Sequence, residues 1–178
     1  MLKLIAFGGS SSKNSINKTF AAYTAQQFAT IADIEILDLN DYPLPLYSID
    51  LEKEAGIPAN AVDFYEKIQS ADFLVISMAE HNGSYTAAFK NLLDWMSRYQ
   101  QQIFADKKML LLSTSPGGRG GKGVMDTVLV RFPIHGANII GHFSLPQFQL
   151  NFDKQQGVVN PELKVIYDNL IESVKNAL

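Results

Sequence analysis

The chain has 178 residues, of which 47% are apolar, enough to fill the core of a single domain spanning residues 1–178. Its formal net charge of −3 offers no basic excess for nucleic acid or an anionic membrane, and the absence of cysteine excludes disulfides, thiolate metal sites and a thiol nucleophile. Any redox chemistry would therefore have to come from a cofactor. The N-terminal apolar run is too short for a secretion signal, so we expect a cytoplasmic protein.

Short apolar runs alternate with segments of helical periodicity along the whole chain. The spacing predicts helices over 60–70, 85–98 and 123–134, one that starts near Ile16 and one that Pro161 opens. Strands are predicted over 2–7, 34–39, 73–78, 109–113 and 138–143. This alternation predicts an α/β fold with a doubly wound, five-stranded parallel sheet of strand order 2-1-3-4-5, whose ligands bind beyond the carboxyl ends of the strands.

The loop after the first strand reads GGSSSKNSIN and is rich in hydroxyl and amide side chains. Main-chain N–H groups at the start of the following helix, together with such side chains, favour a phosphate group. A serine-rich helix cap would explain only one or two of these residues. The loop lacks two glycines of the dinucleotide fingerprint, and Ser12 stands where a nucleophile elbow needs glycine.

The loop after the third strand reads SMAEHNGSY. Its Asn82–Gly83–Ser84 segment could bring main-chain N–H groups close to a flat ring, or Asn82 or Ser84 could simply cap the next helix. A metal site at Glu80 and His81 is not expected, because adjacent loop residues rarely reach one ion and no third ligand is evident.

The loop after the fourth strand, residues 113–123, contains five glycines. It does not satisfy the P-loop pattern, since Pro116 and Gly123 stand where glycine and a hydroxyl residue are required. The glycines indicate either a backbone that passes closely against a flat ligand or a flexible lid.

The three loops together resemble the NADPH-dependent FMN reductase family, whose fold is flavodoxin-like. The resemblance rests on the first-loop motif GS with SxN, on ExN followed by KNLLDW, and on SxSxGG with a second GG pair. It implies FMN as bound cofactor, with its phosphate in the first loop and its ring between the other two. The implied cofactor-binding residues are Ser10, Ser12, Ser15, Ile16, Asn17, Glu80, His81, Asn82, Gly83, Ser113, Ser115, Gly117 and Gly118.

Two positions depart from the family pattern. Ser12, followed by Lys13, stands where the family commonly has arginine, so the charge partner of the phosphate stays open. His81 stands where the family commonly has tyrosine.

The resemblance implies ping-pong hydride transfer from NADPH or NADH to a small acceptor such as a flavin or quinone, with no catalytic side chain because the flavin carries the chemistry. The alternative is an FMN-binding electron carrier or regulatory module without reductase activity. Neither the preferred nicotinamide cofactor nor the acceptor follows from the sequence.

Two features predict a homodimer or a dimer of dimers. The helix over 85–98 carries Leu92, Leu93, Trp95 and Met96 on more of its circumference than one buried face needs. The long connection over 40–60 predicts a dimer arm, with an Ω-loop packed on its own domain as the alternative.

Overall fold

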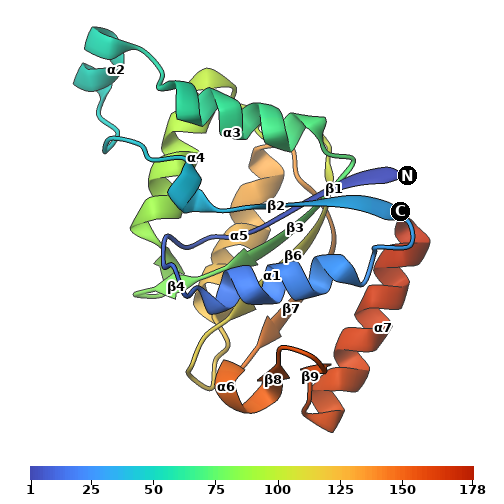
Figure 1. Cartoon of the computed structure of the whole chain (residues 1–178). Coiled ribbons are helices and arrows are strands. Elements are labelled where there is room, and N and C mark those ends of the chain that lie inside the picture. Colours follow the sequence, from blue (N-terminus) through green and yellow to red (C-terminus); the bar gives the residue numbers. More distant parts are fainter.

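The computed structural model describes all residues from 1 to 178 and consists of one main sheet covered by helices on both faces (Figure 1). Five parallel strands run in the order β2-β1-β3-β6-β7, which confirms the predicted order 2-1-3-4-5. The strands are β1 (Leu2–Gly8), β2 (Ala32–Leu37), β3 (Phe73–Met78), β6 (Lys108–Thr114) and β7 (Asn138–Leu145). No helix is both long enough and apolar enough to cross a membrane.

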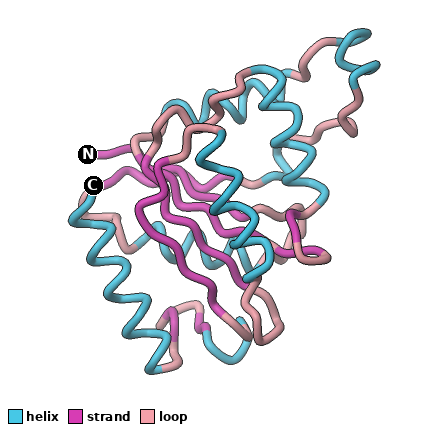
Figure 2. The backbone as a smooth tube through the Cα atoms, turned by 180° about the vertical axis from the view of Figure 1, so that it is seen from behind, coloured by secondary structure: helices cyan, strands magenta, loops and turns pink.

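Helices cover both faces of the sheet, as the tube view from behind also shows (Figure 2). One face packs against α1 (Ile16–Gln26) and α7 (Pro161–Ala177), and the other against α3 (Ala59–Ser70), α4 (Ala87–Tyr99) and α5 (Lys122–Ile134). Residues of β1 alternate between the two cores: Leu4 and Ala6 face α1, whereas Ile5 and Phe7 face α3 and α4. This two-sided burial explains why the strands read as continuous apolar runs.

Short elements complete the chain. They are a 3-10 turn (Leu39–Asp41), α2 (Ile49–Ala55), the hairpin of β4 (Glu80–His81) and β5 (Ser84–Tyr85), α6 (Phe148–Asn151), and the hairpin of β8 (Phe152–Asp153) and β9 (Gly157–Val158).

Two predicted elements start two residues away from where the structure begins them, and the strand predicted over 138–143 extends to Leu145. The second strand occupies residues 32–37 instead of 34–39, because Asp38 ends it: its carboxylate accepts the N–H of Asn40 at 2.9 Å and starts the 3-10 turn. The fourth helix begins at Ala87 and not at Tyr85, because Thr86 is its cap and accepts the N–H of Phe89 at 3.1 Å.

The apolar residues around α4 are buried within the chain itself. The expectation that this helix needs a second copy to cover its apolar surface is therefore wrong. Leu92, Leu93, Trp95 and Met96 are each at most 3% exposed. The 40–60 segment covers this side of the helix: the Trp95 indole donates to the Pro45 carbonyl at 2.8 Å. Tyr47 packs edge-on against the Trp95 ring with centroids 5.0 Å apart. This packing favours the Ω-loop alternative for that part of the segment, while α2 extends away from the body (Figure 1).

Candidate functional site

The three polar loops meet around one cavity of about 260 Å³ at the carboxyl ends of β1, β3 and β6. Its wall consists of Ser10, Ser12, Asn14, Ser15, Ile16, Asn17, Ala79, Glu80, His81, Thr114, Ser115, Pro116 and Gln149. Eight of these thirteen were predicted from the sequence. This is the position at which doubly wound sheets bind their ligands, where the strand order reverses between β1 and β3.

The first loop presents hydrogen-bond donors to this cavity. The Ser15 hydroxyl caps α1 by accepting the N–H of Lys18 at 3.1 Å. The N–H groups of Ile16 and Asn17 lie in the first turn of α1, where the helix itself offers no acceptor. The Ser10 hydroxyl accepts the N–H of Ser12 at 3.1 Å and thereby shapes the loop. A helix start with free N–H groups and flanking hydroxyls is suited to a phosphate.

Close packing of the helix start on β1 depends on Gly8. A Cβ atom built there would clash with the main-chain nitrogen of Lys18, so no larger residue fits. The glycine therefore sets how near α1 begins to the end of the strand.

The Asn17 side chain lines the cavity and also makes hydrogen bonds to the ends of β3 and β6. It is 3% exposed, and its Oδ1 accepts the Ser77 hydroxyl at 2.7 Å and the Thr114 N–H at 3.1 Å. Its Nδ2 donates to the Thr114 carbonyl at 3.1 Å. Asn17 thus joins the start of α1 to the ends of β3 and β6, which leaves one amide hydrogen and its main-chain N–H for a ligand.

The second loop folds as the two-stranded hairpin β4–β5. Asn82 and Gly83 form its tip with φ values of 53° and 77°, the left-handed pair that tight hairpins require. Both tip residues are exposed and lie outside the cavity wall, whereas Glu80 and His81 line it. The prominence of Asn–Gly in the sequence is therefore explained by the turn.

Glu80 also connects the second loop to the third. Its Oε2 accepts the Val124 N–H at 2.8 Å and so caps α5, which has no side-chain cap of its own. A Cβ atom on Gly123 would lie 2.8 Å from this carboxylate oxygen, so the glycine leaves room for it.

The third loop divides into a buried base and an exposed tip. Ser113 is fully buried, and its hydroxyl donates to the Gly120 carbonyl at 2.8 Å. Ser115 lines the cavity, while Gly117 and Gly118 are exposed and lie outside its wall. A Cβ atom on Gly118 would meet nothing within 4 Å, so the fold itself does not require that glycine.

Sequence reasoning missed five residues of the cavity wall. They are Asn14, Ala79, Thr114, Pro116 and Gln149. Four of them adjoin predicted positions, and the rule that ligands bind at strand ends would have indicated them. Gln149 lies on α6, just after β7, and only the folded chain brings it to this edge.

The electrostatics of the cavity depend on main-chain dipoles and not on lysine or arginine, since neither lines it. Lys18 is paired with Asp38, and Lys13 is exposed without an ion pair. Glu80 is the only carboxylate in the wall. No group of three or more histidine, aspartate or glutamate side chains is placed to hold a metal ion.

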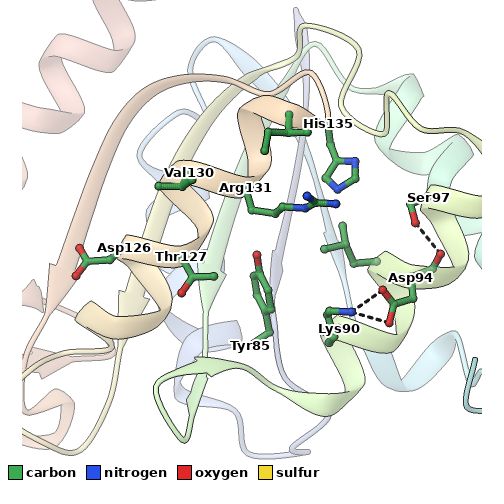
Figure 3. Close-up of a pocket in the computed structure, with 11 residues that line it drawn as sticks. Tyr85, Lys90, Asp94, Ser97, Asp126, Thr127, Val130, Arg131 and His135 are labelled. Atoms are coloured by element: carbon green, nitrogen blue, oxygen red, sulfur yellow. Dashed lines mark hydrogen bonds and ion pairs between the residues drawn. The ribbon is translucent and has the colours of Figure 1, made fainter.

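The largest cavity of the molecule, about 640 Å³, lies elsewhere, between α4 and α5 (Figure 3). It shares no wall residue with the three-loop cavity. The smaller cavity is the candidate site, because it has the convergent donors and the position at the sheet's switch point.

A doubly wound parallel sheet with a donor-rich cavity at its switch point defines a flavodoxin-like α/β protein, and such a cavity is suited to a phosphate-bearing ligand. The family model described as NADPH-dependent FMN reductase matches residues 2–149. The chain belongs to this family.

The chain is also similar to several relatives and solved structures. An uncharacterized protein of Mycoplasma pneumoniae is 32% identical over 149 residues, covering 81% of this chain and 87% of that protein. The quinone reductase of Escherichia coli K12 is 34% identical over 124 residues, covering 67% of this chain and 63% of that enzyme. The flavoenzyme NAD(P)H:(acceptor) oxidoreductase FerB from Paracoccus denitrificans has a TM-score of 0.74 at 21% identity, covering 99% and 98% of the two chains. That last likeness shows the fold.

Proposed function

We propose that this chain is an FMN-containing oxidoreductase that takes a hydride from NADPH or NADH and passes it to a small acceptor such as a flavin or a quinone. The observation that carries the proposal is the three-loop cavity, in which free main-chain N–H groups and serine hydroxyls converge at the switch point of the sheet. Membership of the FMN reductase family supports the choice of FMN.

The first loop would hold the FMN phosphate. Ser10, Ser12 and Ser15 offer hydroxyls, while Ile16 and Asn17 offer the N–H groups of the first turn of α1. The positive end of the helix dipole would offset part of the phosphate charge in place of an arginine.

The second and third loops would hold the flavin ring. Glu80, His81 and Ser115 lie in the cavity wall and could contact it directly. We assign the other predicted positions roles in shaping these loops: Asn82 and Gly83 form the hairpin tip, Ser113 anchors the base of the third loop, and Gly117 with Gly118 leave space beside it.

The flavin, when bound, supplies hydride acceptance and donation. The chain's own contribution is position and polarity: main-chain N–H groups favour the negative charge of a reduced ring, and one open face serves donor and acceptor in turn. No side chain of the cavity needs to act as acid or base.

We further propose that the protein works in the cytoplasm, as a single domain over 1–178 that assembles as a homodimer or dimer of dimers. The rival role, an electron carrier without reductase activity, predicts a strongly acidic surface for docking, which a net charge of −3 does not supply.

Anaerobic mixing of the purified, FMN-loaded protein with NADPH and then NADH tests the proposal. Rapid loss of the yellow colour, restored on addition of a quinone, is the expected result. Slow or absent bleaching with both donors would favour the carrier.

A matched pair of variants tests the phosphate site. Ser12→Ala should weaken FMN about 10- to 100-fold, because a hydrogen bond to a charged group contributes about 1.5–3 kcal/mol. Ser173→Ala, an exposed serine of α7, should change nothing. Equal affinities of the two variants for FMN would contradict the assignment.

A further inference from the structure

A second cavity adjoins the first-loop end of the candidate site. Its volume is about 450 Å³, within the range of about 300–1,000 Å³ that small-molecule pockets occupy. It lies on the outer surface of α1, between Ile36 of β2 on one side and Phe152 of β8 on the other (Figure 1). We call this cavity the α1 groove.

The α1 groove and the three-loop cavity lie next to each other along two stretches of the chain. Residues 15–17 line the cavity, and Lys18 and Ala22 line the groove. Ala22 lies about 10 Å from the start of the helix along its axis. On the opposite side, Gln149 of α6 lines the cavity and Phe152 of β8 lines the groove. A ligand group that leaves the first loop along α1 therefore enters the groove.

The charge of the three-loop cavity suits a phosphodiester better than a phosphomonoester. No lysine or arginine lines the cavity, and Glu80 adds a carboxylate to its wall. The start of α1 supplies only about half a positive elementary charge. The monoester phosphate of FMN carries about −1.5 to −2 charges at pH 7, whereas each phosphate within a diester linkage carries a single negative charge. The cavity therefore balances the phosphate of a dinucleotide more completely than the phosphate of FMN.

The α1 groove carries the positive charge that the cavity lacks. Lys18 and Lys154 line the groove, and no carboxylate is part of its wall. Lys18 is paired with Asp38, whereas Lys154 is exposed and makes no ion pair. Lys13, in the exposed part of the first loop, is also without an ion pair. A second phosphate that follows the one in the first loop would thus meet unpaired positive charge.

The rest of the α1 groove offers surfaces suited to a flat heterocycle. Ile36 is 40% exposed, and Ala22 keeps the floor low. Tyr23 is half-buried and packs edge-on against Phe152, with ring centroids 5.2 Å apart. The exposed amide of Gln26 can both donate and accept hydrogen bonds at the edge of a base. Apolar and aromatic side chains with one amide are a combination that binds a nucleobase.

We propose that the candidate cofactor site also accepts FAD, with the inner phosphate in the first loop and the AMP half in the α1 groove. The outer phosphate would lie toward Lys154, and the adenine would pack against Ile36 and Tyr23. This inference rests on the proposed function, because it requires a flavin in the three-loop cavity. The adenosine phosphate of NADPH has similar chemistry, but its nicotinamide must reach the flavin ring at the second and third loops, whereas the groove adjoins the first.

Calorimetric titration of the flavin-free protein with FMN and with FAD tests the proposal. FAD should bind at least as tightly as FMN, because the AMP half gains contacts in the groove and the diester linkage lowers the charge in the first loop. Weaker binding of FAD than of FMN would overturn the proposal. Failure of both flavins to bind would instead refute the proposed function.

Lys154→Glu reverses the unpaired charge of the groove and leaves the first loop untouched. The dissociation constant of FAD should rise roughly three- to tenfold, because repulsion replaces an attraction between exposed charges. The dissociation constant of FMN should change by less than about twofold, because FMN has no group in the groove and salt screens the distant charge. The control is Lys53→Glu on α2, which makes the same change of charge outside both cavities and should alter neither constant.

Ala22→Trp tests the space in the groove. Ala22 is half-buried on the outer surface of α1, so the larger side chain would fill the groove while the core stays intact, which thermal melts can verify. FAD should bind more weakly than to the native chain, and FMN should bind as before. Equal effects on the two flavins, or no effect on either, would overturn the proposal. A raised KM for NADPH with unchanged FAD binding would assign the groove to the nicotinamide dinucleotide and overturn it as well.

Discussion

Asn17→Ala should destabilise the protein itself, with or without cofactor. The substitution removes three hydrogen bonds that the Asn17 amide makes to the ends of β3 and β6. The groups left behind are the Ser77 hydroxyl and the N–H and carbonyl of Thr114, all of them buried. Removing one partner of a buried hydrogen bond costs about 1–3 kcal/mol. A water molecule in the small cavity can satisfy part of these groups. We therefore expect the free energy of unfolding to fall by about 3–5 kcal/mol in total.

Urea unfolding of the FMN-free protein measures this loss. Trp95 is the only tryptophan and is fully buried, so its fluorescence reports the transition. The matched control is Ser12→Ala, which removes an exposed hydroxyl that makes no hydrogen bond within the chain and should shift the unfolding free energy by less than about 0.5 kcal/mol.

Ligand titrations separate the two residues further. Ser12→Ala should weaken FMN far more than riboflavin, because its hydroxyl is expected to meet only the phosphate. Asn17→Ala should weaken both ligands to a similar degree, because it loosens the junction of the first and third loops. An Asn17→Ala protein with native stability would show that the hydrogen bonds of this amide to β3 and β6 do not stabilise the fold.

Other variants test single features of the site. Gly117→Val should leave the fold intact, because the nearest atom to a Cβ there is 3.8 Å away, but it should abolish flavin binding if the ring passes closely. Gly120→Val should not fold, because φ is +60° and its Cβ would lie 2.7 Å from the backbone at the end of β7. Glu80→Ala should lower the unfolding free energy by about 1 kcal/mol through loss of the α5 cap, and Glu80→Gln should restore most of it in thermal melts. A hydrogen bond from Lys67 lowers the pKa of Glu35 below 4.5, against the opposing effect of burial. Its stabilisation is therefore present above about pH 4.5 and lost as the pH falls through the lowered value, so Glu35→Gln should show a shallower loss of stability in acid denaturation.

The fold was predictable because its strongest signals are local. Runs such as residues 73–78 are apolar at every position, and the structure buries that strand completely. The right-handed rule for connections between parallel strands then favours the strand order 2-1-3-4-5, and the structure has this order. The weaker strand β2 lies at the sheet edge, and its four middle residues are exposed or half-buried without a regular alternation, so its predicted position is wrong by two residues.

The details of the site were less predictable, because they depend on contacts between distant residues. The resemblance implies that Asn82 and Gly83 contact the ligand, and the same pair is also the strongest short hairpin signal, which the structure bears out. The strands on either side have only two residues each, too few to show periodicity. Likewise, nothing in the local sequence shows that Trp95 is covered by Pro45, fifty positions earlier.

The β4–β5 hairpin shows how a short element beside the site is held in place. Its tip is fixed by Asn82 and Gly83, and its Glu80 carboxylate is fixed by the first turn of α5. Tyr85 is the exception: its ring is held by packing against Phe89, but its hydroxyl is held by nothing in the chain. A hairpin with only four paired residues is marginal by itself, so its order depends on what contacts its two sides. One side of the hairpin, with Glu80 and His81, lines the proposed cofactor cavity, so bound cofactor would stabilise the hairpin.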